Sequence, residues 1–187
     1  MTDALGLRAV FSVVLPATNS ITEPDMAAQR PPGVSNQTFR FPLLGRPDNL
    51  DTLLELMRPT VALAFDCQPD RIVVGYTSEF LPDGITVASR LRAFVEDAVG
   101  CPTTMASDAV PEALKILGAK RIGIITPYLP AEDRNVQEYF TALGFSVTGV
   151  AGLSSARKRL AGTAQISEAD VRDAFARVDA TDVEVLV

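Results

Sequence analysis

The stretch SDAVPEALKILGAKRIGIITPY, residues 107–128, decides the fold class of this chain. Ser107 is an N-cap candidate for a helix over 108–117, and Gly118 is suited to end that helix. The run RIGIIT, 121–126, is almost continuously apolar, which is typical of a parallel strand buried on both faces. A polar loop follows the strand. A helix, a buried strand and a polar loop in this order predict an α/β sheet.

The same alternation continues along the chain and predicts parallel strands joined by right-handed crossovers. We expect two Rossmann-like α/β lobes, an N-terminal lobe over 1–103 and a second lobe over 104–187. The expected strands cover 8–15, 35–42, 71–76, 121–126, 145–151 and 183–187, and the expected helices cover 23–30, 50–65, 86–99, 108–117, 131–143 and 168–178.

Two of these helices have further signals at their ends. Asp48 and Asp51 are the cap candidates for the second helix, and Pro59 is expected to interrupt it before Phe65. Ser167 followed by an acid three residues later resembles a capping box at the start of the last helix.

Composition excludes several classes of function. The 187 residues carry a net charge of −6 with no basic tract, so a nucleic-acid partner is not indicated. No histidine is present, which removes Ser-His-Asp and Cys-His catalysis and the commonest metal ligand. Cys67 and Cys101 form no CxxC pair. With no signal peptide or membrane-length apolar run, a cytoplasmic protein without metal or disulfide is expected.

Polar residues follow three of the predicted strands. Thr18 and Asn19 follow the first, Thr77 and Ser78 follow the third, and Tyr128 follows RIGIIT. Any one of these loops, taken singly, is well explained as helix capping. Ligands of open α/β sheets bind at the carboxyl ends of strands, so the three loops together favour a carboxylate or oxyanion site. Glu79 is either a solvated acid of a first helical turn or an acid/base group.

Four segments resemble the aspartate/glutamate racemase superfamily, in the branch of maleate cis–trans isomerases and arylmalonate decarboxylases. They are LPATNSITEPD, VVGYTSEFLPDG, TTMASDAVPEALKILGAKRIGIITPY and VQEYFTALGFSVTGV. The resemblance covers nearly the whole chain and implies two similar lobes related by a pseudo-two-fold axis, with a cofactor-free and metal-free active site in the cleft between them. Because such enzymes often pair, it also allows a homodimer.

The resemblance assigns roles to individual residues. Asn19, flanked by Thr18, falls on an asparagine that binds a substrate carboxylate. Thr77 and Ser78 match a hydroxyl pair of the carboxylate pocket, and Tyr128 matches a further donor to the substrate.

Two departures from the family pattern concern catalysis. Tyr76 falls at the position of the first catalytic cysteine, or of a glycine in the decarboxylases, and a phenol with pKa about 10 is a poor nucleophile. The second catalytic cysteine of the family follows the strand that VEVLV resembles. The resemblance therefore predicts a C-terminally truncated member whose final portion lies beyond Val187.

These observations predict an isomerase like maleate cis–trans isomerase, acting without a cofactor on a small dicarboxylate. The alternatives are a decarboxylase-like lyase, a carboxylate-binding homologue without catalysis, and a truncated protein without a ligand. If Asn19 binds the carboxylate, Asn19→Ala abolishes binding at an unchanged melting temperature. If it only caps a helix, stability falls by about 1 kcal/mol and binding survives.

Overall fold

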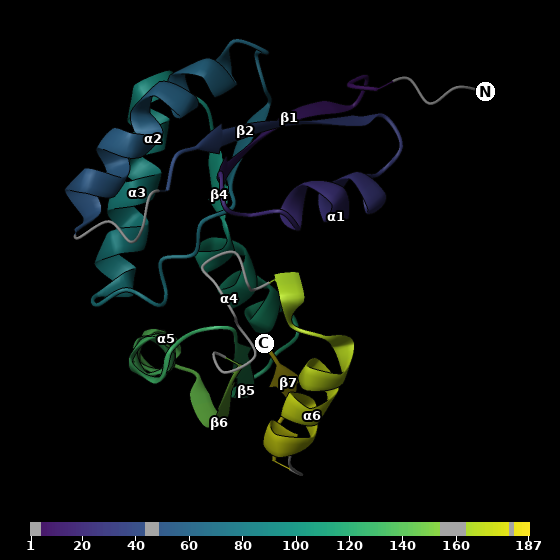
Figure 1. Cartoon of the computed structure of the whole chain (residues 1–187), viewed down its shortest axis with the longest axis vertical. Helices are drawn as coiled ribbons and strands as arrows, with labels where there is room; N and C mark the ends of the chain where they lie inside the picture. The colour runs from purple at the N-terminus through teal and green to yellow at the C-terminus, as the bar shows by residue number, and fades with distance from the viewer. Residues whose placement is uncertain (1–4, 44–48, 154–163, 180–181) are drawn as a thin grey trace. The chain divides into compact units, whose positions relative to one another are not determined.

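The computed structural model describes residues 5–43, 49–153, 164–179 and 182–187. The chain divides into two compact units (Figure 1). Unit 1 comprises Met1–Tyr76 and Ser89–Ala106, and unit 2 comprises Thr77–Ala88 and Ser107–Val187. Each unit contains a parallel sheet with helices, which confirms the predicted α/β class. The boundary at residues 103 and 104 stays a prediction.

Unit 1 is built on a four-stranded parallel sheet in the order β2-β1-β3-β4. Its central strand β1 contains Val13, Val14 and Leu15, each at most 1% exposed, because the sheet is covered on both faces there. The strands are β1 (Ala9–Pro16), β2 (Val34–Phe41), β3 (Arg71–Val74) and β4 (Thr103–Met105). Strand β4 was not predicted, since three residues with two threonines give no periodic signal.

The helices of unit 1 are α1 (Thr22–Ala28), α2 (Leu50–Phe65) and most of α3 (Gly84–Val99). Figure 1 shows α2 and α3 side by side, and Arg58 stacks 4.9 Å above the Phe94 ring between them. The predicted interruption of α2 at Pro59 is wrong, because the helix is continuous. Met57 and Val61, both fully buried, anchor α2 on either side of the proline, and this packing offsets the missing backbone hydrogen bond.

The cap of α2 also differs from the prediction. Asn49 is the N-cap, and its side chain accepts a hydrogen bond from the backbone N–H of Thr52 at 2.9 Å. Asp51 lies inside the first turn, where it suits the positive end of the helix dipole. Asp48 lies outside the described residues.

Unit 2 is built on a three-stranded parallel sheet in the order β6-β5-β7. Helices α5 and α6 pack against these strands, and Ile122 and Ile124 of β5 lie in the core. The strands are β5 (Arg121–Thr126), β6 (Ser146–Gly152) and β7 (Val185–Leu186), and the helices are α4 (Ala106–Ile116), α5 (Pro130–Ala142) and α6 (Glu168–Val178).

The ends of these helices test the predicted caps. Gly118 and Gly144 follow α4 and α5 with φ of 71° and 92°, which is the left-handed conformation expected at such ends. The capping box of Ser167 and Asp170 is present at the start of α6. Ser107 does not cap α4, because it lies within the first turn and its hydroxyl has no partner among the described residues.

Candidate functional site

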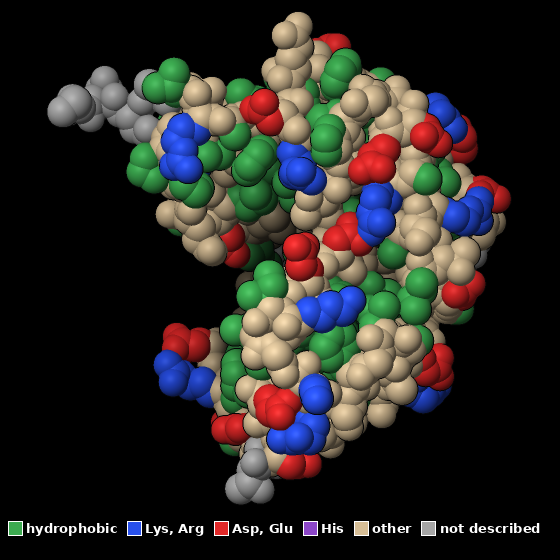
Figure 2. Space-filling model, turned by 180° about the vertical axis from the view of Figure 1, so that it is seen from behind, with side chains coloured by type: hydrophobic (Ala, Val, Ile, Leu, Met, Phe, Trp, Pro, Cys, Tyr) green, Lys and Arg blue, Asp and Glu red, His purple; other side chains and the backbone are tan. Residues whose placement is uncertain are grey.

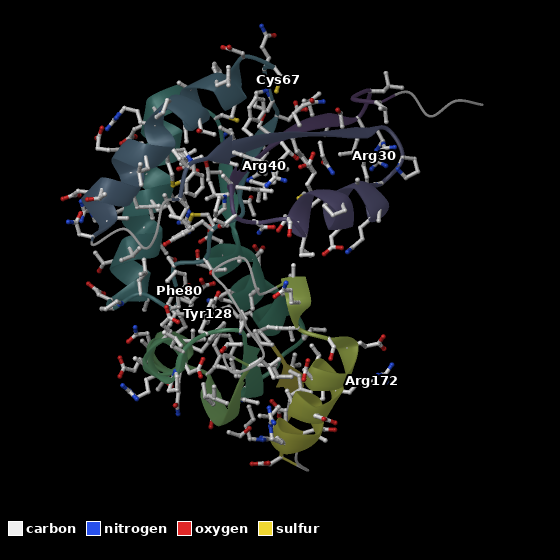
Figure 3. The ribbon with its side chains drawn as sticks, viewed as in Figure 1. Arg30, Arg40, Cys67, Phe80, Tyr128 and Arg172 are labelled. Carbon is white, nitrogen blue, oxygen red and sulfur yellow. The ribbon has the colours of Figure 1, made fainter. Side chains whose placement is uncertain are left out.

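The segment that follows β3 contacts the segment that follows β5 within unit 2. The hydroxyl oxygens of Thr77 and Tyr128 are 2.7 Å apart and share a hydrogen bond. The rings of Phe80 and Tyr128 lie with centroids 5.0 Å apart, and Figure 3 shows the two side chains next to each other. Residues 77–80 therefore lie against Tyr128. Thr77 and Tyr128 are in contact, and Ser78 follows Thr77 in the chain; we call these three residues the hydroxyl cluster.

Two polar atoms in this segment are buried without a hydrogen-bond partner in the described part of the chain. They are the Ser78 hydroxyl oxygen and Oε2 of Glu79. The two residues are 0% and 6% exposed, respectively. A buried polar atom without a partner costs about 1–3 kcal/mol, so it calls for an explanation. One explanation is a ligand that forms the missing hydrogen bonds.

Burial also changes the acidity of Glu79. It raises the pKa of this carboxyl above its ordinary value of 4.5, because the charged form is disfavoured away from water. Backbone hydrogen bonds at Glu79 itself and at Ser78 oppose the shift. The result is a carboxyl group that holds its proton to higher pH than an exposed glutamate.

Local hydrogen bonds hold Tyr128 in place. The Tyr128 backbone N–H donates to the hydroxyl of Thr126 at 3.2 Å, and that hydroxyl donates to the carboxyl of Asp133. The Leu129 backbone N–H donates to Glu132 at 2.8 Å, which closes the first turn of α5. Tyr128 thus stands on a fixed turn between β5 and α5.

The start of α3 and one face of α5 hold residues 78–80. The side-chain amide of Asn135 donates to the backbone carbonyl of Phe80 at 2.8 Å. A Cβ at Gly84 would lie 3.0 Å from the Ser78 carbonyl oxygen and 3.1 Å from the Tyr139 ring, so only glycine fits there without movement. The Tyr139 hydroxyl in turn donates to the backbone carbonyl of Ser107 at 2.7 Å.

The loop after β1 belongs to unit 1 and uses Asn19 locally. Its side-chain oxygen accepts hydrogen bonds from the backbone N–H groups of Ile21 and Thr22, both at 3.0 Å. Its amide nitrogen donates to the Thr22 hydroxyl at 2.9 Å, which leaves its second N–H for another acceptor. Asn19 therefore closes an Asx turn just before α1, whose N-cap residue is Ile21, and Thr18 lies half-buried beside it.

Arg40 is a cation near this loop that the sequence analysis did not single out. Its guanidinium donates to the backbone carbonyl of Asn19 and pairs with Glu23 at 2.5 Å (labelled in Figure 3). Arg40 could have been noticed from the sequence because it lies near the carboxyl end of the second predicted strand, where ligands of such sheets bind. Asn135 was missed as well, because nothing in an amphipathic helix marks which polar residue contacts a distant loop.

Tyr76 and the two cysteines lie in unit 1. The Tyr76 side chain is buried, with its ring edge-to-face against Phe41 at 6.2 Å. The thiol of Cys67 lies 3.1 Å from the Ser12 hydroxyl, and the thiol of Cys101 donates to the Pro69 carbonyl at 3.4 Å. Burial raises the pKa of the Cys101 thiol, so this group is not an activated nucleophile.

Other kinds of site have little support in the described residues. No group of three or more potential metal ligands occurs among them. None of their helices is long and apolar enough to cross a membrane. On the face drawn in Figure 2, basic and acidic side chains are interspersed and form no basic stripe.

The sequence matches a family model described as arylmalonate decarboxylase over residues 69–184. No protein with a curated description matches it in a sequence comparison.

Solved structures resemble the fold over most of the chain. A maleate cis-trans isomerase from Nocardia farcinica, bound to TRIS, is 20% identical with a TM-score of 0.81, covering 95% of this chain and 76% of that one. A crystal structure of arylmalonate decarboxylase is 19% identical with a TM-score of 0.73, covering 95% and 75%. A variant of the maleate isomerase Iso from Pseudomonas putida S16, solved with maleate, is 17% identical with a TM-score of 0.73, covering 95% and 76%.

Proposed function

This chain belongs to the arylmalonate decarboxylase family, and on that premise we propose that it acts on a small dicarboxylate without a cofactor, in the manner of a maleate cis–trans isomerase. The observation that carries the proposal is the hydroxyl cluster. Two of its hydroxyl groups are already within hydrogen-bond distance at 2.7 Å, and the third is buried without a partner in the described chain.

The hydroxyl cluster suits a carboxylate group chemically. A carboxylate has two oxygens and accepts several hydrogen bonds, and hydroxyl groups donate to it without a formal positive charge. Ser78 gains the partner it lacks when the ligand binds, so binding removes a cost that the free protein carries. In this proposal the Thr77 and Tyr128 hydroxyl groups, which share a hydrogen bond in the free protein, donate to the ligand carboxylate when it binds.

The same donors suit the reaction. Chemistry at the carbon next to a carboxylate moves negative charge onto the carboxylate oxygens, as in an enolate. Hydrogen-bond donors that are fixed before the reaction stabilise such charge where it develops. Asn19 and Thr18 are proposed as further substrate contacts, and Tyr76 as a catalytic residue.

A decarboxylase-like reaction is the second candidate, and two observations favour it. The family model is that of the decarboxylase, and position 76 is a buried tyrosine. One Nocardia farcinica maleate isomerase structure contains a covalently bound succinylcysteine intermediate, which requires a reactive thiol. In a decarboxylation the bond to one carboxylate breaks and carbon dioxide leaves. The electron pair stays as an enolate at the hydroxyl cluster until the carbon takes up a proton.

Proton NMR in deuterated water distinguishes these reactions. Maleate turning into fumarate supports the isomerase, and phenylmalonate turning into α-deuterated phenylacetate supports the decarboxylase. Binding of both acids without turnover supports a carboxylate-binding homologue. If neither acid binds and neither reacts, the proposed function is wrong.

A further inference from the structure

Glu79 stands out in unit 2 as a buried carboxyl group beside a cluster proposed to bind another carboxylate. Thr77 and Phe80, on either side of it in sequence, both contact Tyr128. Between them, the Ser78 hydroxyl and Oε2 of Glu79 are two of the buried side-chain atoms without a partner in the described chain. The acid is therefore part of the same short segment as the hydroxyl cluster.

The surroundings of Glu79 favour its neutral form. Burial is the main cause of its raised pKa, and within the described residues no ion pair joins its carboxylate to a basic side chain. The titratable groups nearest to its segment are Asp83 in the same loop, Tyr128, whose ring lies against Phe80, and Tyr139, which lies beside Gly84. Helix α5, which contacts Phe80 through Asn135, also carries Glu132, Asp133 and Arg134 in its first half.

A neutral carboxyl group and a ligand carboxylate complement each other. The acid hydrogen needs an acceptor, and a ligand carboxylate is one, whereas two ionised carboxylates at one site repel. We propose that Glu79 determines the specificity of this site: its carboxyl group donates a hydrogen bond from Oε2 to a dicarboxylate ligand and admits that ligand only while it is protonated. This inference rests on the proposed function, since it assumes that the hydroxyl cluster binds a carboxylate.

The inference predicts that ligand and proton bind together. Above the pKa of free Glu79, each ligand dianion that binds takes up one proton from solvent. Affinity for the dianion is then highest at low pH and falls about tenfold per pH unit above that pKa. A ligand with an ammonium group should show the opposite pH dependence, because the ammonium group would pair with ionised Glu79.

Titration calorimetry with succinate tests the inference between about pH 7 and about pH 9, where succinate stays a dianion. Wild-type affinity is expected to fall across this range, with proton uptake seen as a dependence of the heat on the buffer. Glu79→Gln keeps a donor and removes the titration. It is expected to bind with the same affinity throughout, so its advantage over wild type should grow about tenfold per pH unit above the pKa of free Glu79. Asp83→Asn, an exposed acid in the same loop, should keep the wild-type profile.

The outcomes separate this inference from the proposed function. If wild type binds succinate with constant affinity and no proton uptake, Glu79 does not set specificity, and the proposed function stands. If wild type and Glu79→Gln, both folded by circular dichroism, bind no dicarboxylate at any pH, the proposed function and this inference both fail.

Discussion

The loop after β1 and the segment after β3 carry similar polar side chains but use them differently. In the first loop, Asn19 makes three hydrogen bonds to its own neighbours and closes the start of α1. In the second, the Ser78 hydroxyl and Oε2 of Glu79 are buried without a partner in the described chain. In the first arrangement the side chain is used mainly to hold the local turn, with one N–H left over, whereas in the second two buried atoms lack a partner altogether.

The difference shows why polar residues after a strand are ambiguous. A side chain that caps a helix stabilises the protein whether or not a ligand is present. A buried polar atom without a partner destabilises the free protein. A ligand that forms a hydrogen bond to this atom removes the destabilisation in the bound state. The two regions should therefore respond oppositely when their polar groups are removed.

Tyr128→Phe should have the largest effect on binding. It removes a hydroxyl proposed to donate to a charged carboxylate, which is worth about 1.5–3 kcal/mol, or about 10- to 100-fold in affinity. Titration calorimetry with succinate measures this loss. Thr77→Val, which removes the other end of the 2.7 Å contact, should weaken binding similarly.

Thr141→Val is a matched control for that series. Its hydroxyl donates to the backbone carbonyl of Gln137 on the exposed side of α5. If Thr141→Val binds succinate as wild type does and Thr77→Val binds it more weakly, the loss is specific to the hydroxyl cluster. Unchanged affinity in Tyr128→Phe and Thr77→Val would remove the hydroxyl cluster from the binding site.

Glu79→Gln should change the pH dependence of stability. Because the pKa of Glu79 is raised in the folded chain, its contribution is complete below the ordinary value of 4.5 and is lost as pH rises through the raised pKa. The substitution should increase the free energy of unfolding by about 1–3 kcal/mol at alkaline pH and leave it almost unchanged at acid pH. Burial also raises the pKa of Asp133, so a pH dependence of the same sign should remain in the variant.

Urea unfolding at several pH values measures this change. Glu138→Gln, at an exposed position of α5, serves as the control and should not alter the profile. If the free energy of unfolding changes with pH in the same way in wild type and in Glu79→Gln, ionisation of Glu79 does not destabilise the folded protein.

Most of the fold could be predicted from the sequence because its signals are local. Apolar runs such as RIGIIT fix strands, and residues such as Gly144 and Ser167 fix helix ends. The errors arise where tertiary packing decides the outcome. Pro59 stays inside α2 because buried residues flank it, and β4 exists because β3 pairs with it.

The candidate site was predictable only in part. Loops after strands pointed to Thr77 and Tyr128, and the structure brings these two together. The burial of Glu79 was not predictable, since an acid in a loop is normally solvated and its sequence contains no sign of the α5 face that covers this segment. Whether Asn19 caps a helix or faces a ligand depends on backbone angles that a motif does not specify.

Ser78→Ala should separate binding from stability. It removes a hydroxyl that has no partner in the described chain, so the free energy of unfolding should stay the same or rise slightly. Affinity for succinate should fall about tenfold, because the ligand loses one neutral donor. Thermal melting and calorimetry on the same sample measure both quantities, with Ser146→Ala at an exposed position as the control. A loss of stability would mean that the hydroxyl has a structural role.

Two substitutions at Asn19 should produce the smallest effects and decide the role of the first loop. Asn19→Ala removes the hydrogen bonds of the turn before α1 and should lower the free energy of unfolding by about 1 kcal/mol in urea. Asn19→Asp keeps the accepting oxygen, so stability should stay near wild type, while the donor N–H is lost and a negative charge is added. If Asn19 also binds the substrate, Asn19→Asp loses affinity for succinate although the turn is intact. Equal affinity in wild type and Asn19→Asp would mean that Asn19 only stabilises the turn before α1. The proposed carboxylate contacts would then be restricted to the segment after β3 and Tyr128.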